Sequence, residues 1–217
     1  MADADSRAGA RYTNEEIFRF VDKTHASHDG GLEAAFNSPG SDGVPAIQVG
    51  PSEGKLLDLL VRMVGARKIV EVGTLAGYSA IRMAQALPAD GKLWTIEYEN
   101  THADVARRNL ATAGVSDKVE VVVGAAMDVL PTLEKSGPFD VVFVDADKGN
   151  YHNYGAWAAK HLRPGGLLIG DNAYLFGNLM QDSDRAKAMR QFHEEAAVAF
   201  HSVCVPTPDG MLVGIKR

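Results

Sequence analysis

A charged group of residues follows a strongly apolar run in this sequence. Phe139–Val144 is rich in β-branched and aromatic residues, which is typical of a strand buried on both faces. Asp145, Asp147 and Lys148 come directly after it. Charges at the end of a buried strand cost stability unless they have partners, and in an open α/β sheet ligands bind at the carboxyl ends of strands. The run therefore predicts a functional site that includes Lys148. The alternative is that Lys148 is an ordinary solvated lysine in a loop.

A second apolar run ends in the same way. Leu167–Gly170 is followed by Asp171 and Asn172. If the two strands are neighbours, Asp145, Asp171 and Asn172 lie side by side and offer three hard oxygen ligands, which suit Mg²⁺ or Ca²⁺. The alternative is that these side chains cap the helices that follow, a frequent use of Asp and Asn. We favour a metal site because two strand ends converge on it.

A glycine-rich turn stands between an earlier strand and its helix. It reads Glu71-Val-Gly73-Thr-Leu-Ala-Gly77-Tyr-Ser79 and lacks the G-x-G-x-x-G spacing of dinucleotide sites. Glycines there let the backbone approach a ligand, and Glu71 would repel a pyrophosphate but suits a cationic amino group. Glu97, which ends the next strand, is placed to accept hydrogen bonds from ribose hydroxyls. S-adenosylmethionine fits this pattern; the alternative is a tight turn with two solvated glutamates.

Composition excludes several classes of function. The chain has 217 residues, a formal net charge of −6 and no block of Lys or Arg, which argues against nucleic acid as a partner. No apolar run approaches the roughly 20 residues that span a bilayer, and the amino terminus does not resemble a signal peptide. Cys204 is the single cysteine, so an intramolecular disulfide is impossible. We expect a soluble, cytoplasmic protein with no membrane partner.

Hydrophobic periodicity predicts the elements that position these residues. Thr13–Glu16 has the form of a capping box that opens a helix, whereas residues 29–50 are rich in glycine and are expected to form a loop-rich, lid-like segment. A further helix begins near Ser52. From Lys68 onward strands and helices alternate: strands over 68–73, 93–97, 119–124, 139–144 and 167–170, and helices over 78–87, 101–113, 127–133, 151–162 and 183–200.

This alternation predicts an α/β fold with a doubly wound, Rossmann-like, mostly parallel sheet and helices on both faces. The last two strands, 202–205 and 211–216, flank Pro208–Gly210 and are expected to form a C-terminal antiparallel hairpin. We expect a single domain over residues 1–217. Within it, residues 1–50 would form the N-terminal helix and lid-like segment, and residues 51–217 the α/β core that binds cofactor and metal.

Six segments of the sequence occur together in one enzyme family. They are Gln48–Leu57 (QVGPSEGKLL), Glu71–Ser79 (EVGTLAGYS), Thr95–Glu97 (TIE), Val144–Lys148 (VDADK), Gly165–Gly166 and Asp171–Asn172. Together they resemble the class I cation-dependent O-methyltransferases, the family of catechol O-methyltransferase and the caffeoyl-CoA O-methyltransferases. The resemblance runs from about Ala46 to the carboxyl terminus. It implies S-adenosylmethionine as cofactor, Mg²⁺ or another divalent cation, a small catechol or phenolic substrate and a homodimer.

Carried over position by position, the resemblance implies roles for single residues. Lys148 would be the general base. The divalent cation would be bound by Asp145, Asp171 and Asn172. The substrate would meet Ile47, Lys148, Asn172, Tyr174 and Phe176. Cofactor binding would involve Val49, Glu71, Gly73, Tyr78, Ser79, Glu97, Gly124, Ala125, Ala126 and Asp145.

The chemistry explains why these residue types are needed. A phenol has a pKa of about 10, so it is mostly protonated at neutral pH and must be ionised in place. A divalent cation bound to both catechol oxygens stabilises the catecholate, and a neutral lysine amine beside it can accept the phenolic proton. The oxyanion and the sulfonium neutralise each other as the methyl group moves, so a dry pocket favours the reaction.

Two departures from the family pattern bear on the substrate. Plant enzymes that act on CoA esters carry a longer insertion after the Asp-Asn pair, whereas only Ala173–Asp182 fills that space here. A small catechol is therefore expected, with a caffeoyl-CoA-type substrate as the alternative. The animal catechol enzymes have an acidic residue in the segment that corresponds to His201–Cys204, and this chain has none there. The sequence therefore does not identify a residue that contacts the non-methylated hydroxyl. A nicotinamide-dependent oxidoreductase and a non-catalytic cofactor-binding protein are the alternatives from other classes.

Overall fold

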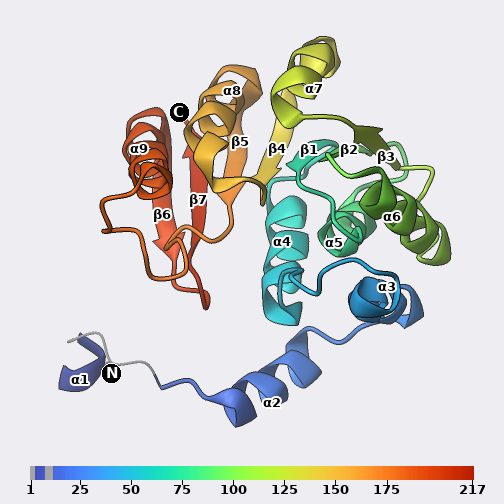
Figure 1. The fold of residues 1–217 in the computed structure, drawn as a ribbon, viewed down its shortest axis with the longest axis horizontal. Helices are drawn as coiled ribbons and strands as arrows, with labels where there is room; N and C mark the ends of the chain where they lie inside the picture. Colours follow the sequence, from blue (N-terminus) through green and yellow to red (C-terminus); the bar gives the residue numbers. More distant parts are fainter. Residues whose placement is uncertain (1–2, 8–11) are drawn as a thin grey trace.

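A seven-stranded sheet forms the centre of the molecule in the computed structural model, which describes residues 3–7 and 12–217. The strand order is β3-β2-β1-β4-β5-β7-β6 (Figure 1). Neighbours among the first five strands pair in parallel, whereas β7 is antiparallel to both β5 and β6. The predicted mostly parallel sheet with a C-terminal antiparallel hairpin is confirmed. The strands are β1 (Lys68–Val72), β2 (Lys92–Glu97), β3 (Val119–Val123), β4 (Phe139–Val144), β5 (Leu162–Gly170), β6 (Phe200–Val205) and β7 (Met211–Lys216).

Helices cover both faces of this sheet (Figure 1). The first face packs against α3 (Gly30–Ser41), α4 (Pro51–Met63), α5 (Tyr78–Ala86) and α6 (Asn100–Thr112). The second packs against α7 (Ala126–Leu133), α8 (Tyr151–His161) and α9 (Asp184–Ala199). The central strands are apolar on both sides because each face has its own core, which explains their nearly continuous hydrophobic runs. Smaller elements are α1 (Ala4–Arg7), α2 (Glu15–His25) and the 3-10 turns η1 (Glu134–Ser136) and η2 (Lys148–Asn150).

The N-cap of helix α2 differs by one residue from the prediction. Asn14, not Thr13, caps the helix: its side chain accepts a hydrogen bond from the backbone N–H of Ile17 at 2.9 Å. Asn is at least as good a cap as Thr, because its short side chain reaches the free N–H groups of the first turn. The predicted helix forms, but the capping-box assignment was wrong.

The prediction of a loop-rich segment over residues 29–50 was wrong in its first half, where α3 forms instead. Asp29 caps this helix by accepting from the backbone N–H of Leu32 at 2.8 Å. Leu32 and Ala35 are buried in the first core. A Cβ on Gly31 would lie 2.6 Å from the Cα of Ala113, so glycine allows a close approach to the end of α6. Burial and capping therefore outweigh the low helix propensity of glycine.

The carboxyl ends of β1 and β4 form the point where the chain reverses its direction across the sheet. The chain passes from β1 outward to β2 and β3, and then returns to β4 on the other side of β1. Crossover helices leave such a point on opposite faces, which opens a crevice at the strand ends. The backbone N–H of Asp145 donates to Val72, and that of Asp171 donates to Val144, each at 2.9 Å. The two acidic strand ends therefore lie side by side, as predicted.

In the described ranges 3–7 and 12–217, no helix is long and apolar enough to cross a membrane.

Candidate active site

A cavity of about 860 Å³ lies at this crevice. That volume is within the range of small-molecule and cofactor sites. Its wall is built from backbone and side chains that directly follow the parallel strands, together with the segment before α4. The lining includes Pro45, Ile47, Gln48 and Val49, residues 72–76, Tyr78, Ser79, residues 96–99, residues 124–127, residues 145–148, Asn150, Tyr154, Asn172, Phe176 and Arg185.

The glycine turn after β1 brings the backbone to the cavity without a side chain in the way. Gly73 has φ of 97°, and a Cβ at this position would lie 2.0 Å from the carbonyl oxygen of Asp145. Gly77, with φ of 83°, precedes the first residue of α5. Only glycine adopts such a backbone without strain, and no other residue fits the contact of Gly73. The two strand ends therefore approach each other closely at the cavity.

Glu71 lies behind the cavity wall and is fully buried. Its carboxylate accepts hydrogen bonds from the hydroxyls of Ser79 (2.5 Å) and Thr95 (2.6 Å). Burial raises the pKa of Glu71 to about 8, with the charges of Asp145 and Glu97 adding to the effect against the two hydroxyl donors. A cationic group bound in front of Ser79 would favour the ionised carboxylate, because opposite charges stabilise each other strongly in a dry site.

Glu97 lines the cavity and is held by backbone donors. One carboxylate oxygen accepts from the N–H groups of Leu75 at 2.8 Å and Thr74 at 3.2 Å, and the other accepts from Glu99 at 3.0 Å. These three bonds fix the carboxylate at the end of β2, and one lone pair remains for a ligand, on the oxygen that lies 3.5 Å from His102 Nδ1. Such an acceptor suits vicinal hydroxyls like those of ribose.

Lys148 is buried at the opposite end of the cavity, next to Asp145. Its Nζ donates to Asp145 Oδ1 at 3.1 Å and to the hydroxyl oxygen of Tyr151 at 2.7 Å. The Tyr151 hydroxyl in turn donates toward the carbonyl oxygens of Val144 (3.2 Å) and Asp171 (3.0 Å). Burial, together with the charges of Asp145 and Asp171, raises the pKa of Tyr151 well above its usual value, so the hydroxyl keeps its proton. Tyr151 thereby connects Lys148 to the ends of both β4 and β5.

Asp171 and Asn172 follow β5 beside this lysine. Asp171 is buried, and its Oδ1 has no hydrogen-bond partner within the described part of the chain. Burial and the nearby charge of Asp145 raise the pKa of Asp171 to about 7. Asn172 lines the cavity with φ of 52°, in the left-handed region that Asn tolerates better than most residues. A buried carboxylate oxygen without a hydrogen-bond donor is suited to coordinate a cation.

The donor set as a whole is suited to a hard divalent cation. Asp145, Asp171 and Asn172 would supply two carboxylates and an amide oxygen, which is the ligand chemistry of Mg²⁺. Over residues 3–7 and 12–217 no group of three or more His, Cys, Asp or Glu side chains is placed to hold a metal ion. The predicted set contains only two such side chains, Asp145 and Asp171, which follow neighbouring strands.

The cavity gathers most of the residues that the sequence predicted for the site. Glu71 and Asp171 lie just behind its wall, and Tyr174 lies outside it, with its ring beside Gly210 of the terminal hairpin. Sequence reasoning missed Tyr151, because an aromatic residue on a predicted helix is more often part of the core or of the helix face. Its spacing of three residues from Lys148, across a turn, is the signal that could have revealed the contact. The predicted residues that line the cavity are Ile47, Val49, Gly73, Tyr78, Ser79, Glu97, Gly124, Ala125, Ala126, Asp145, Lys148, Asn172 and Phe176.

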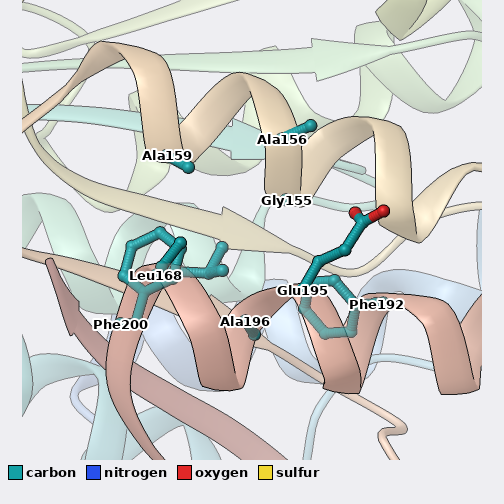
Figure 2. Close-up of a pocket in the computed structure, with 9 residues that line it drawn as sticks. Gly155, Ala156, Ala159, Leu168, Phe192, Glu195, Ala196 and Phe200 are labelled. Atoms are coloured by element: carbon teal, nitrogen blue, oxygen red, sulfur yellow. The ribbon is translucent and has the colours of Figure 1, made fainter.

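A second, smaller cavity lies between α8 and α9 over β5 and offers no comparable chemistry. It measures about 290 Å³ and is lined by Leu168, Phe192, Phe200 and small residues of the two helices. Figure 2 shows Glu195 as the only side chain with polar atoms among those drawn, and its carboxylate accepts a hydrogen bond from Gln191 at 2.8 Å. The site is therefore assigned to the larger cavity.

Comparison with known proteins gives a consistent result. Residues 33–216 match a family model described as O-methyltransferase. A catechol O-methyltransferase of Niastella koreensis is 40% identical over 210 residues, which cover 94% of this chain and 95% of that protein. A catechol O-methyltransferase of Mycobacterium tuberculosis is 43% identical over 174 residues, covering 80% and 79%. The crystal structure of the O-methyltransferase TomG from Streptomyces achromogenes in complex with SAM has a TM-score of 0.88 at 37% identity, covering 93% of this chain and 96% of that one.

Proposed function

Because the chain belongs to the O-methyltransferase family, we propose that it methylates one hydroxyl of a small catechol-type molecule with the help of a divalent cation and Lys148. The general reaction, O-methyl transfer from S-adenosylmethionine, follows from the family and from its cofactor-bound structural relatives. The proposal adds the identity of the methyl acceptor, the divalent cation and the general base. Over residues 1–217 we propose a single methyltransferase domain.

The cofactor is proposed to lie between the glycine turn and the ends of β2 and β3. Glu97 would accept hydrogen bonds from the ribose hydroxyls, and residues 124–126 would border the adenine. Val49, Glu71 and Ser79 would hold the methionine part, with buried Glu71 ionising as the amino group binds. S-adenosylmethionine supplies the electrophilic methyl group at its sulfonium. The glycine turn would hold the ends of β1 and β4 close together beside the cofactor, since a Cβ on Gly73 would meet the carbonyl oxygen of Asp145.

The divalent cation is proposed to be held by Asp145, Asp171 and Asn172. The partnerless Oδ1 of Asp171 supports this assignment, because a buried carboxylate oxygen without any donor is costly unless a cation completes it. When bound, the cation would stabilise the ionised catechol and orient its two oxygens.

Lys148 is proposed to accept the phenolic proton at its Nζ. Asp145 and Tyr151 fix this nitrogen from two sides, so that the amine does not need to be ordered when the substrate binds. Tyr154 donates to Asp147 at 2.5 Å and thereby holds the loop that carries Lys148. The apolar side chains of Ile47 and Phe176 would shield the reacting groups from water, which strengthens the electrostatic effects within the site.

The observation that carries the proposal is the buried contact of Lys148 with Asp145 in the wall of the same cavity that the glycine turn opens. The test is a screen of catechols with S-adenosylmethionine labelled in its methyl group, with and without EDTA, followed by determination of which hydroxyl is methylated. Transfer to one hydroxyl that requires the divalent ion supports the proposal. Transfer only to a CoA thioester, or to phenols without a neighbouring hydroxyl, contradicts the catechol assignment.

We also propose a homodimer, with a second copy of the chain covering helix α2. None of the residues of α2 is buried, and Ile17, Phe18 and Phe20 expose large apolar side chains. Exposed apolar helix faces of this kind are typical of association surfaces. Light scattering should give twice the monomer mass for the wild type. Phe20→Lys should shift the equilibrium toward the monomer, whereas Phe20→Leu should not.

A further inference from the structure

Within residues 3–7 and 12–217, two strongly basic side chains line the cavity, and only one of them has a partner. Lys148 contacts Asp145 and Tyr151. Arg185 also lines the cavity, yet its guanidinium makes no hydrogen bond or ion pair within residues 3–7 and 12–217. An arginine presents five N–H donors in a rigid fork that matches a carboxylate. A guanidinium at a cavity wall without a protein acceptor is therefore available to an anionic group of a ligand.

The fold places Arg185 at the substrate end of the cavity rather than the cofactor end. It is the second residue of α9, after the N-cap Ser183, and α9 packs against the turn η2 that begins with Lys148. The positive end of the helix dipole adds to the charge of the guanidinium at this position. The flanking acids Asp182 and Asp184 contact Lys187, at 2.9 and 3.9 Å, and not Arg185.

The two acids that line this end of the cavity, Asp145 and Asp147, are already engaged by the protein. Asp145 pairs with Lys148, and Asp147 accepts hydrogen bonds from Tyr154 at 2.5 Å and from Asn150 at 2.6 Å. An ammonium group on the substrate would therefore have to compete with these donors, whereas a carboxylate would meet a guanidinium without a competitor. The charge pattern favours an anionic substrate over a cationic one.

We propose that Arg185 binds a carboxylate on the substrate, and that the acceptor is a catechol with an acidic side group, of the dihydroxybenzoate or dihydroxycinnamate type. This inference rests on the proposed function. The two hydroxyls face Lys148 and Asn172, and the acidic group on the far side of the ring reaches Arg185. Arg185 is then a specificity-determining residue, because its bidentate hydrogen bonds hold the acidic group equally in the ground state and the transition state.

The experiment uses the full chain with S-adenosylmethionine and Mg²⁺. Its substrates are 3,4-dihydroxybenzoate, unsubstituted catechol, dopamine and caffeoyl-CoA. Arg185→Gln should raise KM for 3,4-dihydroxybenzoate about tenfold with little change in kcat, the size expected when a charge-assisted hydrogen bond is lost at an exposed position. KM for unsubstituted catechol should stay within about twofold, since it has no group for Arg185 to bind. Arg185→Lys should recover part of the loss.

Lys187→Gln is the matched control, because Lys187 lies on the same helix turn and does not line the cavity. It should leave all of the KM values near those of the wild type. An equal effect of Arg185→Gln on acidic and neutral catechols would overturn the inference, and so would an effect confined to caffeoyl-CoA, which would assign Arg185 to a phosphate. If the wild type methylates none of the catechols, the proposed function itself fails and this inference falls with it.

Discussion

The Nζ of Lys148 lies 2.7 Å from the hydroxyl oxygen of Tyr151, and that same hydroxyl donates to the backbone carbonyl of Asp171. The pair joins a residue of the loop after β4 to the end of β5. Because both side chains are buried, the contact fixes the position of the lysine amine relative to the predicted metal ligands.

Tyr151→Phe should therefore lower turnover about ten- to hundredfold, because Lys148 loses the contact that aligns it. Affinity for S-adenosylmethionine should stay near that of the wild type. The substitution should also cost about 1–3 kcal/mol of unfolding free energy, since the carbonyls of Val144 and Asp171 and the Nζ of Lys148 each lose one hydrogen-bond partner. Steady-state kinetics and calorimetric binding check these expectations. Unchanged turnover together with reduced stability would limit Tyr151 to a structural role.

Lys148→Ala should reduce turnover by a factor of about 10² to 10⁴, the usual contribution of a general base. Cofactor affinity should change little. Lys160→Ala, at an exposed position of α8, is the control and should behave as the wild type. If Lys148→Ala instead loses cofactor binding, the lysine maintains the structure of the cavity and another group takes the proton.

Removal of the divalent cation should abolish methyl transfer. EDTA should stop turnover, and added Mg²⁺ should restore it, because ionisation of the catechol depends on the cation. Equilibrium binding of S-adenosylmethionine, measured in the same buffers, serves as the control and should survive chelation. If turnover is the same with and without EDTA, the assignment of Asp145, Asp171 and Asn172 as metal ligands is wrong.

The buried carboxyl of Glu71 predicts a pH dependence of cofactor binding. Its pKa of about 8 means that the group is protonated in the unliganded chain at neutral pH. Binding of the cofactor amino group requires ionised Glu71, so affinity should rise between pH 6 and about 7.5, by at most about tenfold per pH unit. Above about pH 8 the amino group itself loses its proton and the gain should end. Glu71→Gln should bind weakly and without this rise, as measured by titration calorimetry in metal-free buffer.

The same shift has a definite sign for the stability of the unliganded chain. The pKa of Glu71 is higher in the folded state, about 8, than its ordinary value of 4.5. Between these values the folded chain holds a proton that the unfolded chain has released, so this group makes stability fall as pH rises from about 4.5 to about 8. Chemical denaturation of the wild type and of Glu71→Gln across this window should show a smaller decline in the variant. Parallel curves would contradict the assignment.

Gly73→Ala should destabilise the chain by more than about 3 kcal/mol and prevent cofactor binding. The new Cβ would lie 2.0 Å from the carbonyl oxygen of Asp145, and φ of 97° adds backbone strain. Gly30→Ala is the matched control, because a Cβ there meets nothing within 4 Å and the residue begins a helix. Thermal unfolding of both variants tests the difference. A Gly73→Ala protein as stable as the Gly30→Ala protein would show that the two strand ends can separate without cost.

The prediction from sequence was most accurate where local pattern and burial act together. The alternation of strands and helices from Lys68 onward is confirmed, because each strand is buried on both faces and each helix buries one stripe. The neighbouring positions of Asp145 and Asp171 followed from two consecutive parallel strands. Helix α3 escaped prediction, because its glycine-rich sequence is helical only through the burial of Leu32 and Ala35 against other helices.

The sequence by itself determined the fold class and the oxygen-bearing ends of β4 and β5, because a strand's own side chains dictate which of its faces are buried and where it ends. Only the tertiary structure placed the Tyr151 hydroxyl between Lys148 and Asp171, and brought Arg185 to the cavity without a partner among the described residues. Contacts of this kind depend on how α8 and α9 pack against the turn after β4. That packing is a sum of many small interactions between residues distant in the chain, and no local pattern of residue types records it.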